Sequence, residues 1–280
     1  MNINIRNSSA AEMLLIIQLS SMDGRAAGQN DADVFYRFDP EGFFIAVEDS
    51  TLAGSISAVT YDDSFGFIGL HFVMPKFQNT ALGEKLLEAA LQKLGERTAG
   101  INCLETQEPY YAGHGFKAAH KILTYEGTAS CKNCSMENIV SPFMHPFELL
   151  IGLNKKYYPY ETKGLLAAWL HQAGSLLLAK QEDSKFSGYG LYIPCSNGYK
   201  VSPLVCRDAE TAEELLTALV YHMNSGARFS IDLPESNKDA VKLAEKMKLK
   251  KVKETIRMYN KVEPEILIQN VFSYTNNELG

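Results

Sequence analysis

The residues best suited to chemistry lie in one stretch of the first half of the chain. Val73-Met74-Pro75 closes a run of strand formers, the small and amide side chains of 78–83 follow, and an amphipathic segment begins at Gly83. A strand that runs into a helix through such a loop leaves backbone N–H groups unpaired at the positive end of the helix dipole. Because glycine lets an anion approach these amides closely, the stretch predicts a site for a phosphorylated ligand. The simpler alternative is a strand-to-helix turn without a ligand.

His71 and Glu105 are candidates for moving a proton beside this loop. His71 shares a strand face with Gly69 and Val73, and histidine changes its charge near neutral pH. Glu105 follows on the next predicted strand, from which it could act through a water molecule. A strand histidine is more often a hydrogen-bonded structural residue than a catalytic one, so His71 is not favoured over Glu105. The sequence therefore does not choose between these two bases.

The loop resembles motif A of the GNAT superfamily of acetyl-CoA-dependent N-acetyltransferases, which is written Q/R-x-x-G-x-G/A. Gln78 and Gly83 match this pattern in register, and Ala81 replaces its first glycine. Further downstream, "YYAGHGF" resembles the second landmark of the superfamily, an aromatic pair followed by Gly-Phe, and places Tyr111 at the general-acid tyrosine. "QNDADVFYRFDPEGFF" and "GYKVSPLV" extend the resemblance over the whole chain, to bacterial two-domain members with a divergent second domain.

The resemblance implies a role for each matched position. Backbone amides of the loop would hold the pyrophosphate of acetyl-CoA (coenzyme A), and the strand edge at Phe72 and Val73 would pair with its pantetheine arm and supply an oxyanion donor. Tyr111 would protonate the leaving thiolate. The implied cofactor-binding residues are Phe72, Val73, Gln78, Asn79, Thr80, Ala81, Leu82, Gly83 and Glu84. The resemblance implies no metal.

Two departures from the motif bear on the affinity for the cofactor. The loop is neutral, so only Lys76 and Lys85 lie near enough in sequence to offset phosphate charge. Ala81 is tolerated if its backbone is right-handed, whereas a positive φ at this position would cost roughly 1 kcal/mol.

The elements that must position these residues follow from periodicity. Helical spacing predicts helices over 10–20, 30–38 and 83–95, with Asp31 as a cap of the second. β-rich runs between turn signals predict strands over 43–49, 52–62, 65–75, 101–107 and 121–127. The loop before the second helix is expected to select the acceptor, because Asp31 and Asp33 could attract an ammonium group and Phe35 and Tyr36 could shape a pocket.

The same order of elements recurs after a connector rich in Ser, Asn, Cys and Pro, which predicts an internal duplication. The predicted fold class is therefore α/β, an α+β mixed sheet in two tandem GNAT-like domains. Each domain is expected to have a mixed, mostly antiparallel sheet flanked by helices. The predicted divisions are a catalytic, cofactor-binding domain at 1–128, a linker at 129–146 and a degenerate domain at 147–280.

The second copy of the motif lacks what a phosphate site needs. "VSPLVCRDAETAEELL" has no glycine in its loop, and Asp208 and Glu210 stand where they would repel phosphate. Ala244 occupies the position that matches Tyr111, and Lys248-Leu249 replaces Gly-Phe. We therefore expect the second domain to stabilise the first and to form a wall of the acceptor pocket.

Composition narrows the possible partners. The 280 residues carry a net charge of -6, which gives no basic field for nucleic acid. No segment reaches the roughly 18 apolar residues of a membrane span, and five scattered cysteines, including the Cys131/Cys134 pair, are expected to be reduced thiols. The sequence thus predicts a cytoplasmic monomer or homodimer that binds neither membrane nor nucleic acid.

Two functions fit these features. The first is an N-acetyltransferase (an acyltransferase) that transfers an acetyl group from acetyl-CoA to a primary amine of a small molecule or peptide. The alternative is a non-catalytic CoA- or ligand-binding or regulatory protein on the same tandem scaffold. Tyr111 and Gly83 favour the enzyme, and the neutral loop favours the binding protein.

Overall fold

The two halves of the chain repeat one order of elements. The computed structural model describes residues 3–22, 27–49, 51–130 and 133–280. The first half contains β1 (Ile3–Asn7), α1 (Ala10–Met22), α2 (Asp31–Phe38), β2 (Phe43–Glu48), β3 (Thr51–Thr60), β4 (Phe65–Val73), η1 (Pro75–Phe77), α3 (Leu82–Leu94), β5 (Thr98–Cys103), η2 (Glu105–Gln107), α4 (Glu108–Gly113) and β6 (Lys117–Thr128).

The second half follows the same scheme and adds a C-terminal segment. Its elements are β7 (Ile139–Val140), η3 (Pro142–Met144), α5 (Glu148–Tyr157), α6 (Lys163–Trp169), β8 (Leu176–Glu182), β9 (Lys185–Cys195), β10 (Gly198–Cys206), α7 (Ala209–His222), β11 (Arg228–Pro234), α8 (Lys238–Lys246), β12 (Lys250–Tyr259), η4 (Ile268–Asn270) and β13 (Val271–Ser273). The predicted duplication is confirmed. The opening strands β1 and β7, and β13, were not predicted.

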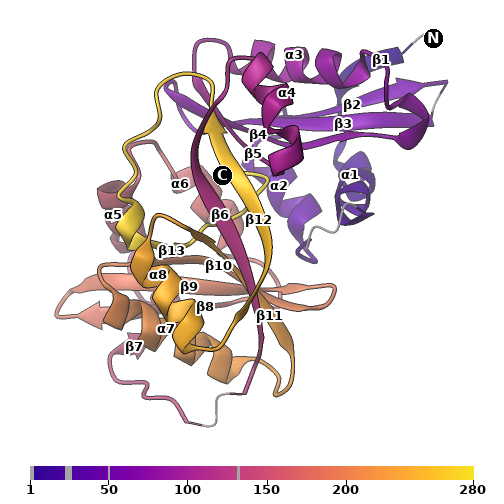
Figure 1. Cartoon of the computed structure of the whole chain (residues 1–280). Helices are drawn as coiled ribbons and strands as arrows, with labels where there is room; N and C mark the ends of the chain where they lie inside the picture. Colours follow the sequence, from indigo (N-terminus) through magenta and orange to yellow (C-terminus); the bar gives the residue numbers. More distant parts are fainter. Residues whose placement is uncertain (1–2, 23–26, 50, 131–132) are drawn as a thin grey trace.

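One mixed, mostly antiparallel sheet runs through both halves. Its strand order is β1-β2-β3-β4-β5-β12-β6-β11-β10-β9-β8-β7. The halves therefore exchange strands: β12 of the second half lies next to β5 of the first and pairs with it, and β6 of the first half lies next to β11 of the second and pairs with it. Figure 1 shows β6 and β12 side by side where they pass from one half to the other. The sheet therefore continues across the linker that the sequence predicted at 129–146.

Helix α3 shows why the sequence forms these elements. Its buried residues Leu82, Leu86, Leu87, Ala90 and Leu94 recur at helical spacing and cover one face of the helix. That face packs on β3 and β4. The helix ends at Gly95, whose φ of 59° suits a residue without a Cβ atom. The helix that carries the predicted anion site is thus anchored on the strand that precedes it.

A shared aromatic core joins the two halves. Phe35 of α2 stacks on Trp169 of α6 with ring centroids 6.1 Å apart, and Phe65 of β4 stacks on Tyr160 at 4.2 Å. Trp169 is fully buried, and its indole N–H donates to the Ser202 carbonyl at 2.7 Å. Burial of large aromatic rings dominates the energetics of such a core. The halves therefore belong to one folding unit through side chains as well as through the sheet.

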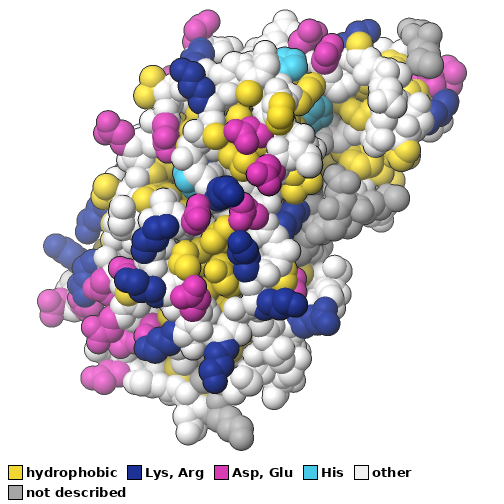
Figure 2. Space-filling view, viewed as in Figure 1, with side chains coloured by type: hydrophobic (Ala, Val, Ile, Leu, Met, Phe, Trp, Pro, Cys, Tyr) yellow, Lys and Arg dark blue, Asp and Glu magenta, His cyan; other side chains and the backbone are white. Residues whose placement is uncertain are grey.

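The surface over the exchanged strands carries charges of both signs. Figure 2 shows Lys and Arg side chains interspersed with Asp and Glu on the face viewed, around small apolar areas. On β12, for example, Lys251 Nζ lies 3.3 Å from Glu254 Oε2. Among the helices described here, none is both long and apolar enough to cross a membrane.

Candidate active site

Strands β4 and β5 pair as parallel neighbours over only part of their length. The pairing runs from Phe65 and Thr98 to Ile68 and Ile101, after which β4 continues to Val73 without a β5 partner. A β-bulge begins at this point, where Leu70 has a φ of 47° and its carbonyl accepts from Ser55 Oγ at 2.9 Å. The β4–β5 pairing ends just before this bulge and leaves a gap in the sheet, so the end of β4 has one edge without a β5 partner.

The open edge of β4 leads to the first turn of α3. Met74 N–H donates to the Ala53 carbonyl on β3, and neighbouring amides of a strand point in opposite directions, so Val73 N–H faces the gap. Helix α3 begins after Ala81, which caps it without a side-chain hydrogen bond. The Leu82 N–H donates to Thr80 Oγ1 at 3.3 Å, which leaves the N–H groups of Gly83 and Glu84 at the start of the helix for an anion. Of the two oxyanion donors predicted, Val73 faces the gap and Phe72 faces β3.

The loop contains one residue with a left-handed backbone conformation, at a position that the motif did not indicate. Asn79 has a φ of 66°, a left-handed conformation that asparagine adopts more readily than most residues. Ala81 has φ -71° and ψ 11°, so its methyl group carries no backbone penalty. The condition that the sequence set for Ala81 is therefore met.

His71 and Tyr111 form a hydrogen-bonded pair in the wall of a cavity beside this loop. His71 Nδ1 lies 2.9 Å from the Tyr111 hydroxyl, and Nε2 lies 3.1 Å from the Gly83 carbonyl. A carbonyl only accepts, so Nε2 carries the proton and Nδ1 of the neutral ring accepts from the Tyr111 O–H. Because both ring nitrogens are engaged, the histidine orients the tyrosine.

Tyr110 presents a buried hydroxyl to the same cavity. This hydroxyl has no hydrogen-bond partner among the residues that the structure describes. Burial, reinforced by Glu84 and Glu88, raises the pKa of Tyr110, so its hydroxyl stays protonated and can donate. The sequence signalled this residue only as the first member of the aromatic pair.

The cavity has a volume of about 450 Å³ and gathers most of the predicted residues. Its wall includes His71, Tyr111, Phe72, Val73, Gln78, Thr80, Gly83 and Glu84, together with Tyr110, Thr106 and Gln107. Three predicted cofactor residues lie outside this wall: Asn79 and Ala81 are exposed in the loop, and Leu82 is buried in the core. Thr106 and Gln107 were missed because the sequence assigned 101–107 to a strand.

Glu105 does not lie where the sequence placed it. Strand β5 ends at Cys103, and Glu105 begins the short helix η2 with an exposed side chain. It lines neither of the two cavities described here. The β5 run ends early because the sheet has already opened at the β4 bulge, and a base role for Glu105 has no geometric support.

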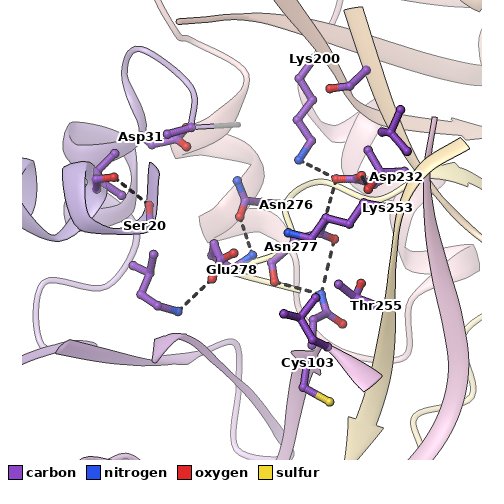
Figure 3. A pocket seen from close by; sticks show the side chains of 18 of the residues that line it. Ser20, Asp31, Cys103, Lys200, Asp232, Lys253, Thr255, Asn276, Asn277 and Glu278 are labelled. Atoms are coloured by element: carbon purple, nitrogen blue, oxygen red, sulfur yellow. Dashed lines mark hydrogen bonds and ion pairs between the residues drawn. The ribbon is translucent and has the colours of Figure 1, made fainter. Parts of the chain in front are cut away.

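A second cavity of about 500 Å³ lies between the two halves (Figure 3). Leu70, Cys103 and Gln107 of the first half and Lys200 and Asp232 of the second are among its lining residues. Gln107 also lines the cavity at α3, so the two spaces adjoin. The first half thus meets the second at a cavity next to the His71–Tyr111 pair.

The acidic residues predicted to select the acceptor separate in the structure. Asp31 is 4% exposed and lines the second cavity, whereas Asp33 points to solvent and pairs with Arg37 at 2.9 Å. The prediction that Asp31 caps α2 is wrong. Asn30 holds the cap position, and the Asp31 carboxylate reaches back to Gly28 N–H. Phe35 also lines this cavity.

The C-terminal segment closes part of the gap between β4 and β5. Glu278 Oε2 accepts from Leu70 N–H at 2.9 Å, and the Leu279 carbonyl accepts from the Tyr61 hydroxyl at 2.6 Å. A Cβ atom at Gly69 would stand 2.2 Å from the Glu278 carbonyl, so only glycine lets the segment pass. This segment places a carboxylate at the bulge, beside the second cavity.

In the second half, the equivalent gap is filled by the chain itself. Strand β10 pairs with β11 only up to Val201, and β13 then takes the open edge at Leu204 and Val205. The first turn of α7 is capped by Asp208, whose Oδ1 accepts from Thr211 N–H at 2.9 Å. The strand edge is therefore occupied by β13, and a carboxylate stands at the helix start, where a CoA pyrophosphate would need to bind.

Coenzyme A fits the features of the first half. The open edge of β4, the uncapped turn of α3 and the unpartnered Tyr110 hydroxyl all offer donors on one cavity. A Cβ atom at Gly83 would stand 3.6 Å from Val73, 3.7 Å from His71 and 3.8 Å from the Tyr110 hydroxyl. The absent methyl group thus leaves a cradle between these residues.

Comparisons with known proteins match both halves. A model of the "Acetyltransferase (GNAT) family" matches residues 13–116, and one of the "Acetyltransferase (GNAT) domain" matches residues 150–273. The holothin acyltransferase of Pseudoalteromonas sp. (strain SANK 73390) is 21% identical over 90% of this chain and 86% of its own.

Solved structures share the architecture over nearly the whole chain. A protein from Pyrococcus horikoshii assigned as an acetyltransferase superposes with a TM-score of 0.86 at 20% identity, covering 100% of this chain and 96% of its own. A tandem GNAT protein from the clavulanic acid biosynthesis pathway gives a TM-score of 0.65 at 11% identity, covering 92% and 98%. With one GNAT unit matched in each half, the chain belongs to the GNAT family of acyltransferases as a two-domain member.

Proposed function

We propose that the chain transfers an acetyl group from acetyl-CoA to a primary amine of a small molecule or peptide. The observation that carries this proposal is the open β4 edge, which leads to the uncapped turn of α3 within the cavity of Tyr111. The family and the printed name of the holothin acyltransferase support acyl transfer in general. That the acyl group is acetyl and that the acceptor is an amine are part of the proposal.

Bound acetyl-CoA would supply an activated thioester, so the chain needs to bind, orient and move protons. The amides of Gly83 and Glu84 at the start of α3 would hold the pyrophosphate, and the Tyr110 hydroxyl would add a donor. Val73 N–H faces the gap, where it would lie against the pantetheine or the developing oxyanion.

Tyr111 would donate the proton that the leaving thiolate needs, and His71 would control the direction of its hydroxyl. A neutral His71 accepts from Tyr111, which turns the hydroxyl proton toward the ring. Once His71 is protonated, both of its nitrogens donate, so Nδ1–H would point at the tyrosine oxygen and release the O–H toward sulfur. The pair would then act together as a general acid.

The cavity between the halves would receive the acceptor amine. It adjoins the cofactor cavity at Gln107 and contains Glu278, which Leu70 N–H holds at the bulge of β4. A carboxylate at that position would take the amine proton. In this arrangement the amine would reach the thioester from the cavity between the halves, where the two cavities adjoin at Gln107.

Gly83→Ala tests the proposed function. The methyl group would fill the cradle at 3.6 Å from Val73 without a backbone contact, and alanine favours a helix more than glycine does. We expect an unchanged or higher Tm, loss of the thermal shift that CoA gives the wild type, and loss of thiol release from acetyl-CoA with an amine panel.

Gly152→Ala is the matched control, because Gly152 lies in α5 and a Cβ atom there meets no atom within 4 Å. It should leave CoA binding intact. CoA binding by the wild type without thiol release across a broad amine panel would favour the non-catalytic alternative. CoA binding that survives Gly83→Ala would place the ligand elsewhere.

A further inference from the structure

The carboxylate of Asp31 is only partly satisfied in the wall of the cavity between the halves. Its Oδ2 accepts from Gly28 N–H at 2.8 Å, while Oδ1 has no hydrogen-bond partner within the described ranges. The residue is 4% exposed. A buried carboxylate oxygen without a partner is unfavourable, so a ligand that donates a hydrogen bond would complete this site.

The groups around Asp31 favour a cationic donor over a neutral one. Among the described residues that line the cavity, Asp31, Glu126, Asp232 and Glu278 are acidic, and Lys200 and Lys253 are basic. Lys200 does not serve as the partner of Asp31, because its Nζ lies 2.6 Å from Asp232 Oδ2. Figure 3 shows Lys200 pointing to Asp232. The negative charge of Asp31 is thus not paired with Lys200, and a cationic ligand that enters the cavity could pair with it.

We propose that the acceptor is a primary amine with a second protonated nitrogen, and that Asp31 holds this second cation. The placement rests on the proposed acetyl transfer, because the same cavity adjoins the cofactor cavity at Gln107. Binding of the cation itself does not depend on transfer. Asp31 would therefore set which amines are accepted, while the groups at the β4 bulge would act on the reacting nitrogen.

The pH dependence of binding follows from the ionisation of Asp31. Burial raises the pKa of this carboxyl to about 6, and the nearby charge of Glu278 adds to the rise. The hydrogen bond from Gly28 N–H and the charge of Lys200 act in the other direction and lower the pKa. Cys195 faces the same corner, and burial raises its thiol pKa to about 11, so the thiol stays neutral. Asp31 is protonated below pH 6 in the empty cavity, so cation binding should weaken as the pH falls through 6.

Direct binding of matched amines tests the proposal on the full-length chain. Putrescine, aminobutanol, n-butylamine and γ-aminobutyrate share a carbon skeleton and differ in the terminal group. Calorimetry at pH 8, with and without CoA, should rank putrescine ahead of the two neutral-ended amines and γ-aminobutyrate last. Putrescine should lose about tenfold or more in affinity in Asp31→Asn, which keeps the side-chain shape but not the charge.

Asp63→Asn is the control, since Asp63 is fully exposed and pairs only at the surface with Arg97 at 3.2 Å; it should leave putrescine affinity unchanged. Equal binding of putrescine and n-butylamine by the wild type would overturn the proposal without the need for any variant. So would an Asp31→Asn protein that binds putrescine as tightly as the wild type.

Transfer assays on the same amines separate the two proposals. Acetylation of n-butylamine as efficiently as putrescine would refute the cation site and keep the acetyltransferase. Putrescine binding that depends on Asp31, with no thiol release from acetyl-CoA, would keep the cation site and refute the acetyltransferase.

Discussion

The hydrogen bond between Tyr111 and His71 is the residue-scale feature on which the proposed chemistry depends. Nδ1 of His71 accepts a hydrogen bond from the Tyr111 hydroxyl, because its other nitrogen donates to the Gly83 carbonyl. That commitment argues against His71 as the base for the amine, a role that the sequence left open for it. The two tyrosines also divide the work: Tyr111 is tied to His71, whereas Tyr110 has a hydroxyl that meets no partner in the described chain.

Tyr111→Phe should therefore lower mainly kcat, and Tyr110→Phe should lower mainly the affinity for CoA. The first should lower kcat by about 100-fold, as expected for loss of a general acid, with CoA affinity within about twofold of the wild type. The second should weaken CoA binding several-fold and change kcat less, because it removes only a binding donor. Steady-state kinetics with CoA titrations measure both. A loss of CoA binding in Tyr111→Phe would show that the residue holds the cofactor.

At the scale of elements, the contrast between β4 and β10 is the basis for proposing that the first half binds the cofactor. Both strands leave their parallel neighbour part-way, but β13 pairs with the open edge of β10, whereas the C-terminal segment hydrogen-bonds to β4 at Leu70 N–H, through the Glu278 side chain. The loops after them differ as well: the carboxylate of Asp208 caps α7, whereas the N-cap residue of α3 is Ala81, which has no side-chain acceptor. The sequence identified the second contrast through its carboxylates and missed the first.

The loop before α3 predicts different outcomes at two neighbouring positions. Ala81→Gly should leave CoA affinity within about twofold and cost about 0.5–1 kcal/mol of stability, because Ala81 already has a right-handed backbone. Asn79→Val should weaken CoA binding and destabilise the fold, because a β-branched residue is strained at a φ of 66°. Thermal melts and CoA titrations test both. A large loss of affinity in Ala81→Gly would mean that its methyl group contacts the ligand.

At the scale of the whole molecule, the exchange of β6 and β12 makes the two halves interdependent. Strand β5 pairs with β12 on the edge that faces away from β4, and β6 lies between β12 and β11. Neither half can complete its sheet alone, and an exposed edge invites aggregation. The C-terminal segment adds a further link, since it supplies β13 to one half and Glu278 to the other.

The full chain should therefore unfold in one cooperative step, with calorimetric and van 't Hoff enthalpies that agree. A fragment of residues 1–128 should not fold, because β12, which lies between β5 and β6 and pairs with both, would be missing. Co-expressed with a fragment of residues 133–280, it should be recovered as a folded pair. A folded 1–128 fragment that binds CoA by itself would contradict this interdependence.

Local patterns were enough to predict most of the elements. The apolar spacing of α3, the β-rich runs of β2, β3 and β4 and the repeated order of the second half all lie in contiguous sequence, where period and turn residues report directly on structure. The short strands β1, β7 and β13 escaped because two to five residues carry too little pattern. The residues around the cavity at α3 could be singled out for the same reason, since one strand–loop–helix unit supplies most of its wall.

The sequence by itself determined the duplicated GNAT elements and the anion-ready start of α3. Only the tertiary structure decided that the halves exchange β6 and β12, that β13 fills one gap, and that Asp31, Lys200, Asp232 and Glu278 meet in one cavity. These four residues are far apart in the chain and share no local period. Their association depends on which strands pair across the halves, and that pairing is settled by the energetics of the whole sheet and core.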